Sequence, residues 1–189
     1  MNIKEIFKSA FDEFPVIEFD EFRLRKLTHN DANDIFEIFS NPEVVKYYDL
    51  SQFTSLDQSE KFIKMHNDRY VEKKSINWCI ELLPEKKIIG NCRIYPHMLD
   101  YQNSEKIELG YDLNYSYWLH GYMKSTLKEI IKFCFSFNEV KELYIGLIKE
   151  NIQNIKLVEK LNFKYSKEIK DVEIMPGNKQ DISFYTLLK

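Results

Sequence analysis

The stretch YWLHGYM, residues 117–123, stands where one sequence period gives way to another. KIELGYDL (106–113), before it, alternates apolar and polar residues as a strand does. YMKSTLKEIIKFCFSF (122–137), after it, repeats its apolar residues with helical spacing. Gly121, one of five glycines in the chain, lies between bulky residues at this change. The pattern predicts a strand-to-helix turn whose first helical N–H groups are available to bind an anion.

Outward from this turn, the same periodicities predict a mixed sheet with helices on both faces. We expect an α/β (α+β) fold with a mostly antiparallel central sheet of six to seven strands. A possible break in the first strand lies at Asp20-Glu21, a pair of charged residues within an alternating run. The strands are predicted at 16–27, 75–83, 87–97, 104–113, 142–148, 163–174 and 181–188. The helices are predicted at 32–39, 55–73, 122–137 and 152–161, with a further short helix that begins at residue 42.

No repeat, low-complexity tract or linker interrupts the chain, so we expect one domain over residues 1–189 with an additional amphipathic helix at 1–14. This helix either lies on a membrane surface or docks on the body of the protein, and docking is the favoured alternative. One face of it carries Ile3, Ile6, Phe7, Ala10, Phe11 and Phe14.

Composition and charge exclude several classes of function. The net charge is −3 with no basic run, which argues against nucleic acid as the main partner. No apolar run approaches the roughly 18 residues of a membrane span, and the N-terminus lacks the pattern of a signal peptide. Cys79, Cys92 and Cys134 lie in apolar segments without metal-ligand spacing, so we expect buried thiols, a reducing cytoplasm and no metal. Usage rich in Lys, Ile and Asn is typical of a low-GC bacterium.

Three segments, taken in order, resemble the GNAT superfamily of acetyl-CoA-dependent N-acetyltransferases. They are ELGYDL (108–113), WLHGYM (118–123), and ENIQN (150–154) followed by LVEKLNF (157–163). The opening FRLRKLT (22–28) and NPEV (41–44) are also similar to the family. Within the superfamily, the chain most resembles the branch that acetylates the N-termini of ribosomal proteins. The resemblance covers about residues 16–188, and it depends on the order and spacing of motifs that are weak when taken singly.

The resemblance implies that the turn at Gly121 holds the pyrophosphate of coenzyme A, where the positive end of a helix dipole favours negative charge. A glycine there lets backbone approach an oxygen, although it also permits a tight turn without any ligand. The resemblance implies that Asn151 and Asn154 contact coenzyme A. The alternative is that Asn151 only caps the helix and that Asn154 faces the solvent. The residues implied in binding acetyl-CoA are Asp112, Leu113, Leu119, His120, Gly121, Tyr122, Met123, Lys124, Asn151 and Asn154.

Three positions depart from the family pattern. Leu119 stands where the family often has glycine, and His120 where it has Lys or Arg, so tight binding of CoA is a weaker expectation than binding itself. Lys124 is a candidate to replace the missing cation. Asn162 stands where the family has glycine after the last helix; this change is nearly neutral, because asparagine tolerates a left-handed C-cap best after glycine.

The chemistry requires a neutral amine, which a base would provide. A lysine-like amine has a pKa of about 10.4, so only about one molecule in 10³ is neutral near pH 7. Glu108 matches the family position that accepts the proton, often through water. The alternatives for Glu108 are a surface position or an ion pair with Arg93. A backbone N–H near Gly110 or Tyr111, where the family strand parts from its neighbour, is expected to hold the oxyanion.

The sequence offers several candidates, and no single one, for the proton donor to the CoA thiolate and for the acceptor site. Val158 occupies the place of the tyrosine that many relatives use as the acid, which leaves water as the default, with Tyr117, Tyr122 and Tyr165 as unranked alternatives. His66 and His97 have no partner pattern that would make either a nucleophile or a base, and no P-loop or serine triad is present. The acceptor candidates are Tyr47, Tyr48, Trp78, Tyr95 and His97, for each of which packing is an equal alternative.

The sequence therefore predicts a cytoplasmic N-acetyltransferase that moves acetyl from acetyl-CoA to a primary amine. The acceptor is either a protein N-terminus, such as that of a ribosomal protein, or a small amine such as a polyamine or an amino-sugar antibiotic. One alternative is a catalytically weak acyl-CoA-binding sensor or regulatory module, and another is an interaction domain without a ligand. The oligomeric state is left open between monomer and homodimer.

Overall fold

The computed structural model describes residues 3–96 and 105–189. They form an eight-stranded sheet in the order β1-β2-β3-β4-β5-β6-β8-β7, in which β5 and β6 are parallel and all other neighbours antiparallel. The predicted mixed, mostly antiparallel class is confirmed. The strands are β1 (Ile17–Phe19), β2 (Phe22–Lys26), β3 (Ile76–Leu82), β4 (Lys87–Pro96), β5 (Lys106–Leu113), β6 (Glu142–Ile148), β7 (Lys164–Met175) and β8 (Asn178–Leu188).

The predicted count of six to seven strands was too low, because residues 16–27, which were expected to form one strand, form the two strands β1 and β2. Asp20 adopts a positive φ of 47°, and the chain turns back so that Ile17 pairs with Leu24. The expected break at Asp20-Glu21 is thus a hairpin turn. Asn162 also has a positive φ, 67°, which confirms the left-handed end predicted after the last helix.

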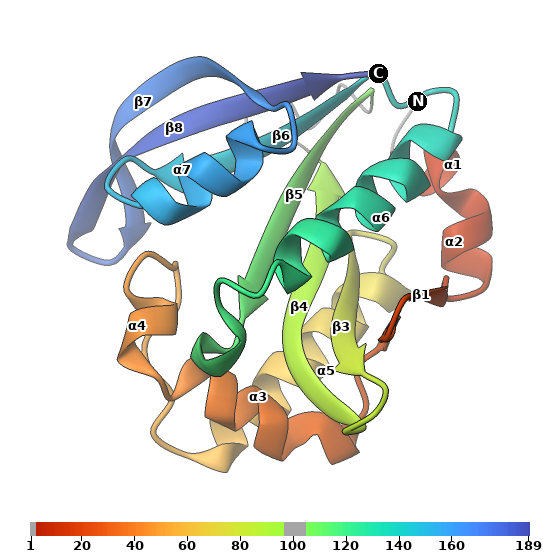
Figure 1. The fold of residues 1–189 in the computed structure, drawn as a ribbon, viewed down its shortest axis with the longest axis vertical. Coiled ribbons are helices and arrows are strands. Elements are labelled where there is room, and N and C mark those ends of the chain that lie inside the picture. The colour runs from red at the N-terminus through yellow and green to blue at the C-terminus, as the bar shows by residue number, and fades with distance from the viewer. Residues whose placement is uncertain (1–2, 97–104) are drawn as a thin grey trace.

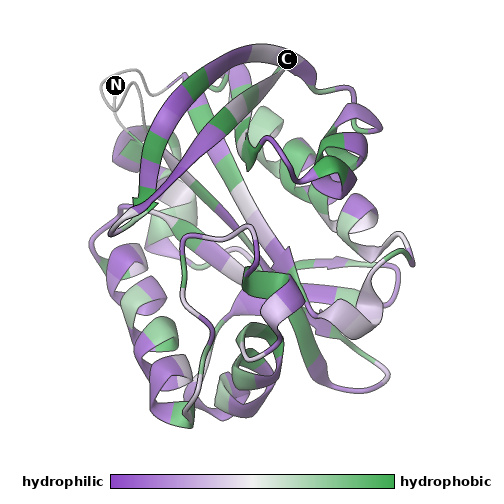
Figure 2. Ribbon diagram, turned by 90° about the vertical axis from the view of Figure 1, so that its left-hand side faces the viewer, coloured by the Kyte–Doolittle hydropathy of each residue, from purple (hydrophilic) through white to green (hydrophobic). Residues whose placement is uncertain are grey.

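Helices cover both faces of the sheet (Figure 1). No helix in the described part of the chain is long and apolar enough to cross a membrane. Figure 2 shows hydrophobic and hydrophilic residues interleaved along helices and strands, as expected for elements with one buried side. On one face lie α1 (Ile3–Ile6), α2 (Lys8–Asp12), α6 (Tyr122–Ser136) and α7 (Ile152–Glu159), and on the other α3 (Ala32–Phe39), α4 (Pro42–Val45) and α5 (Leu56–Val71).

The N-terminal segment packs into the core. It forms two short helices rather than one, and the Phe7 side chain between them is fully buried, with its ring 4.6 Å from that of Phe137 and 6.0 Å from that of Phe133. Ile3, Ile6, Ala10 and Phe11 are buried as well. Of the two alternatives, the structure therefore has the apolar face docked on the protein body.

The sheet opens in its middle, between β5 and β6. These strands pair at only three positions, the last of which joins Glu108 to Tyr144. Beyond it, β5 continues to pair with β4 as far as Leu113, and β6 with β8 as far as Ile148. The two strands diverge from this point (Figure 1). The open edge of β5 thus begins at Glu108 and faces the gap, as the sequence predicts for the strand near Gly110 and Tyr111.

Candidate active site

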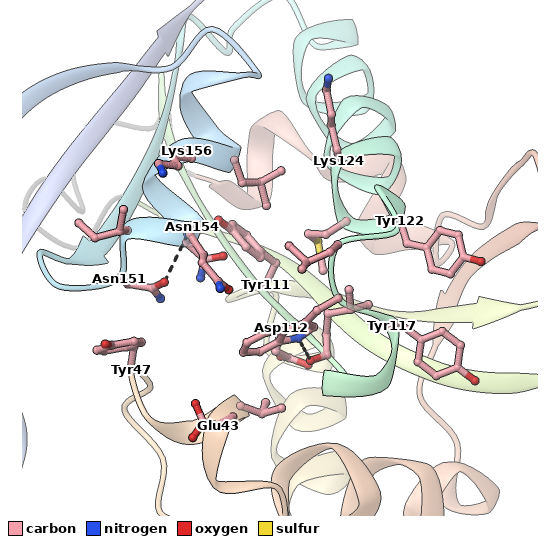
Figure 3. Close-up of a pocket in the computed structure, with 18 of the residues that line it drawn as sticks. Glu43, Tyr47, Tyr111, Asp112, Tyr117, Tyr122, Lys124, Asn151, Asn154 and Lys156 are labelled. Carbon is pink, nitrogen blue, oxygen red and sulfur yellow. Dashed lines mark hydrogen bonds between the residues drawn. The ribbon is translucent and has the colours of Figure 1, made fainter.

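A cavity of about 530 Å³ lies at the open side of this gap. It is bounded by the end of β5, the start of α6, the start of α7 and the segment around α4 (Figure 3). A volume of this size is in the range typical of small-molecule sites. The lining includes Glu43, Lys46, Tyr47, Tyr48, Tyr111, Asp112, Leu113, Leu119, Gly121, Tyr122, Met123, Lys124, Asn151, Asn154, Lys156 and Lys160.

The turn before α6 leaves helical N–H groups exposed to this cavity. Gly121 is the N-cap residue with φ 85°, and no side chain among the described residues caps the helix. A Cβ at Gly121 would meet nothing within 4 Å, so the glycine is required by its left-handed backbone and not by crowding within the protein. Leu119 also has a positive φ, 66°, and its side chain is 92% exposed at the rim. The first N–H groups of α6 consequently remain free for an anion.

All the predicted acetyl-CoA residues except His120 line the cavity. The His120 ring stacks on Tyr122 at 5.6 Å between centroids, with Nδ1 2.8 Å from the backbone oxygen of Trp118. These contacts hold the imidazole outside the lining, so the expected side-chain role of His120 finds no support in its position. Asn151 accepts a hydrogen bond from the Asn154 N–H at 3.3 Å (Figure 3), so Asn151 caps α7 and lines the cavity as well.

Lys156 and Lys160, which the sequence motifs did not single out, bring positive charge to the cavity in addition to the predicted Lys124. Lys156 lies on α7, Lys160 is the C-cap residue of that helix, and Lys124 lies across from Lys156 on α6 (Figure 3). The signal in the sequence was their spacing of four residues after the ENIQN motif. Together with the start of α6, these cations suit a ligand that carries several phosphates.

Glu108 lies at the point where the gap begins, and is not among the residues that line the cavity. Its side chain is only 3% exposed, which makes the surface alternative wrong. The Tyr95 hydroxyl donates a hydrogen bond to Oε1 at 3.2 Å. A Cβ at Gly146 of β6 would come within 3.4 Å of the same oxygen, so the carboxylate is directed toward β6 across the gap.

A buried polar network lies beside Glu108 on the same face of the sheet. Arg93 pairs with Asp112 at 3.6 Å and donates a hydrogen bond to the Tyr48 hydroxyl. The Tyr48 hydroxyl donates to Asp112 at 3.3 Å, and Asn91 donates to the same carboxylate at 2.8 Å. Burial raises the pKa of the Asp112 carboxyl to about 6, against the opposing charge of Arg93. The side chain of Asp112 is thus engaged mainly within the protein.

The acceptor candidates divide into groups. Tyr47 and Tyr48 line the cavity. Trp78 is fully buried and donates its indole hydrogen to the backbone oxygen of Pro15, so of its two alternatives the structure supports core packing. His66, considered only as a nucleophile or base, packs against Phe62, and burial lowers its pKa to about 3, so that it stays neutral. Tyr95 contacts Glu108 as described, and His97 lies outside the described residues.

The tyrosines proposed as acids are poorly placed. Tyr117 donates its hydroxyl hydrogen to Glu85 at 2.8 Å. Tyr122 directs its hydroxyl away from the cavity (Figure 3). Tyr165 is 58% exposed on β7, packs edge-on to Tyr185, and does not line the cavity. Tyr111 also lines the cavity, but its hydroxyl is buried within the protein.

The three cysteines are buried and unpaired, and the described residues contain no group of three His, Cys, Asp or Glu side chains able to hold a metal ion. Burial raises the pKa of all three thiols, to about 12 for Cys79. A buried, protonated thiol is a poor nucleophile. The three thiols are therefore not candidates for a nucleophile.

Comparison with known proteins agrees with the motifs. Residues 21–164 match the model of the acetyltransferase (GNAT) domain. The uncharacterized N-acetyltransferase YoaA of Bacillus subtilis is 28% identical over 176 residues, which are 93% of this chain and 98% of that protein. A ribosomal-protein alanine acetyltransferase from Vibrio fischeri has the same fold, with TM-score 0.75, 16% identity, and coverage of 92% of this chain and 96% of that one.

The fold is shared also by the self-immunity acetyltransferase MccE, solved in complex with acetyl-CoA and AMP, with TM-score 0.78, 18% identity, and coverage of 90% of this chain and 94% of that one. The domain match spans well over half of the chain. The resemblance read from the three sequence motifs is thereby confirmed, and the protein belongs to the GNAT family of acetyltransferases.

Proposed function

We infer that this protein transfers an acetyl group from acetyl-CoA to a primary amine, by direct attack of the amine on the thioester. The observation that carries this inference is the gap between β5 and β6: a buried carboxylate, Glu108, lies where the gap begins, and the cavity at its open side reaches the uncapped N-terminus of α6. A donor with phosphates at one end and a thioester at the other matches these two features.

The phosphates of acetyl-CoA are assigned to the start of α6. The free N–H groups after Gly121 and the positive end of the helix dipole favour negative charge there. Lys124, Lys156 and Lys160 add cations from two helices. These lysines supply the positive charge that His120 does not, so cations remain beside the phosphates despite this departure from the family pattern.

Glu108 is assigned the role of general base. Its carboxylate faces the gap, and the hydrogen bond from Tyr95 fixes the position of Oε1. The amine loses a proton to this carboxylate, directly or through a water molecule, as it attacks the thioester carbon. The oxyanion is assigned to N–H groups on the open edge of β5 near Gly110 and Tyr111, since no strand of the described residues pairs with that edge.

The acceptor is proposed to enter from the side of α4. Glu43 and Tyr47 lie on the cavity wall opposite α7 (Figure 3), and a carboxylate with an aromatic ring suits a cationic amine. The two classes of acceptor are a protein N-terminus and a small amine. The Vibrio fischeri acetyltransferase is named for a ribosomal protein, which favours testing protein N-termini first.

Residues 1–189 are proposed to act as a single domain, since the N-terminal helices share the core that lies under α6. A cytoplasmic location is proposed from the three buried thiols, which are unpaired and therefore suit a reducing compartment.

The test is calorimetric titration with acetyl-CoA, followed in the same sample by measurement of thiol release on addition of amines. The panel contains a hexapeptide with a free α-amino group, spermidine and an aminoglycoside. Binding with amine-dependent release supports the function and identifies the acceptor class. Binding without release from any amine favours the acyl-CoA sensor, and absence of binding contradicts the assignment of the cavity.

A further inference from the structure

One lysine lies on the α4 side of the cavity, away from the place where the phosphates of acetyl-CoA are proposed to bind. Four lysines of the described residues line the cavity, and the three on the side of α6 and α7 are Lys124, Lys156 and Lys160. The fourth, Lys46, is the C-cap residue of α4. It lies between Glu43 and Tyr47, which Figure 3 shows on the wall opposite α7. A primary amine of the protein itself is therefore part of the acceptor wall.

The Lys46 ammonium contacts the two groups that the proposed function assigns to a cationic acceptor. Its Nζ lies 5.3 Å from the centroid of the Tyr47 ring and 4.0 Å from Oε2 of Glu43. An ammonium within about 6 Å of a ring centroid is attracted by the π face of the ring. The ligand-free protein thus places its own primary amine where the amine of an acceptor is expected.

The Lys46 side chain is also accessible and loosely held. The side chains of Lys46 and Glu43 are each 53% exposed, and an exposed ion pair of this kind contributes little to stability. A lysine ammonium is carried on a flexible four-carbon stem. The ammonium therefore leaves Glu43 at little cost, and the stem lets it extend into the cavity.

The wall that carries Lys46 is joined to the open strand β5. Tyr48, two residues further along the chain, donates its hydroxyl hydrogen to Asp112 at 3.3 Å. Asp112 lies on β5 beyond Glu108, the last position that pairs with β6. Lys46, Tyr48 and Asp112 all line the same cavity. The stem of Lys46 thus begins two residues from a side chain that contacts the strand whose open edge is proposed to hold the thioester oxygen.

We propose that Lys46 is a self-acetylation site: when no external amine is present, the protein transfers the acetyl group of bound acetyl-CoA to Nζ of its own Lys46. The proposal rests on the proposed function, because it uses the same donor, the same base and the same acceptor wall. It adds a modification site on the protein itself, and it identifies the amine that an external acceptor must displace.

The reaction balances as follows. The Lys46 ammonium loses one proton to water, because only the neutral amine has a lone pair for attack. Nζ then forms a bond to the thioester carbon, and its second proton passes to Glu108, directly or through water. The C–S bond breaks with its electron pair on sulfur, which takes a proton from water to give the free thiol. One of the two protons lost by nitrogen is thus balanced at sulfur, and the other is released to solvent.

The experiment incubates the wild-type protein with acetyl-CoA in the absence of amines and follows each lysine by peptide mass spectrometry. Lys64 is the first internal control, since its side chain is 75% exposed, pairs with Asp68 on α5, and does not line the cavity. Lys26 is the second, because its Nζ lies 5.2 Å from the centroid of the Tyr70 ring, also outside the cavity. Acetylation without a site would favour the more exposed Lys64. Acetylation directed by the cavity should modify Lys46 about tenfold faster or more than either control, because proximity raises the effective concentration of the amine.

Three further results are expected from a reaction within one molecule. The fraction of Lys46 acetylated per unit time should not depend on protein concentration. Glu108→Gln should slow this acetylation about hundredfold and leave the slow background at Lys64 unchanged. A hexapeptide that is itself acetylated should slow the modification of Lys46, because both amines use Glu43 and Tyr47. In Lys46→Arg, which keeps a cation at this position, the stoichiometric burst of thiol release without external amine should be lost.

The outcomes separate this proposal from the proposed function. Acetylation of Lys46 no faster than that of Lys64, or independent of Glu108, overturns the proposal, and so does a rate that rises with protein concentration. If the wild-type protein acetylates the hexapeptide or spermidine while Lys46 stays unmodified, only the role of Lys46 is contradicted. If the wild-type protein transfers acetyl to no amine, Lys46 included, the proposed function fails and the self-acetylation falls with it.

Discussion

The guanidinium group of Arg93 lies directly over Gly110: a Cβ atom at Gly110 would come within 2.7 Å of Nε and 2.8 Å of Cζ. The two residues are cross-strand partners on β4 and β5. From this position Arg93 reaches Tyr48 and Asp112. Because residue 110 has no side chain, the Arg93 side chain can cross the face of β5 at this position. Its contacts then link Asp112 of β5 to Tyr48 in the cavity wall near α4.

Gly110→Ala is expected to destabilise the protein by about 1–3 kcal/mol, because the new methyl group displaces a buried charge. The free energy of unfolding, measured in urea for Gly110→Ala, Arg93→Ala and the double variant, checks this. If the clash with Arg93 is the cause, the glycine substitution costs much less in the Arg93→Ala background. An equal cost in both backgrounds would show that the arginine is not responsible.

Glu108→Gln should reduce turnover by about hundredfold or more while leaving the Kd for acetyl-CoA unchanged, because the amide keeps the shape of the side chain and cannot accept the proton. Steady-state kinetics and calorimetry on the same preparation separate the two effects. Glu139→Gln, at an exposed position after α6, is the control and is expected to behave as wild type. Unchanged turnover in Glu108→Gln would remove Glu108 from the role of base.

Gly121→Ala is expected to weaken acetyl-CoA binding about tenfold, equivalent to about 1.4 kcal/mol, because a left-handed φ of 85° strains an alanine and shifts the first N–H groups of α6. Gly177→Ala is a matched control, with φ 77° and open space around its Cβ, in the turn between β7 and β8. Both variants should lose similar stability, and only the first should lose affinity. Equal affinities would contradict the anion site.

Asp112 should make stability depend on pH. Its folded-state pKa of about 6 is above the usual value near 3.9, so the folded protein takes up a proton that the unfolded chain takes up only at lower pH. This site therefore adds stability as pH falls from 7 to about 4. Asp112→Asn lacks that contribution, whereas its effect on the buried Arg93 is the same at every pH. The difference in melting temperature, wild type minus Asp112→Asn, should become more positive at pH 5 than at pH 7.5; parallel pH curves would show that Asp112 does not titrate in this range.

Local patterns were sufficient to predict most of the fold. The alternation in β5, the helical period of α6 and the left-handed position of Asn162 depend on residues close in sequence, and all three are as expected. The hairpin at Asp20 was readable for the same reason, since two charged residues interrupt an alternating run. The positions of the three motifs around one cavity followed from their order within a known family.

The contacts that define the site could not be read in this way, because they join residues distant in sequence. The partners of Arg93, Tyr48 and Asp112, come from the segment after α4 and from β5, and a lone arginine in a strand does not indicate them. His120 lies in the expected turn, but its ring is held on Tyr122 outside the cavity. Trp78 looks like an aromatic wall residue in sequence and is a core residue in space.

An open edge inside a sheet has a consequence for solubility. Unpaired strand edges on a protein surface invite pairing with another chain and so promote aggregation. The open edge of β5 lies in the interior of the sheet, with β4 on one side and a gap bounded by β6 on the other. An edge enclosed by strands on both sides is not an outer edge of the sheet, where another protein's sheet would pair. The backbone N–H groups of β5 beyond Glu108 thus stay available to a bound ligand without forming an exposed sheet edge that would promote aggregation.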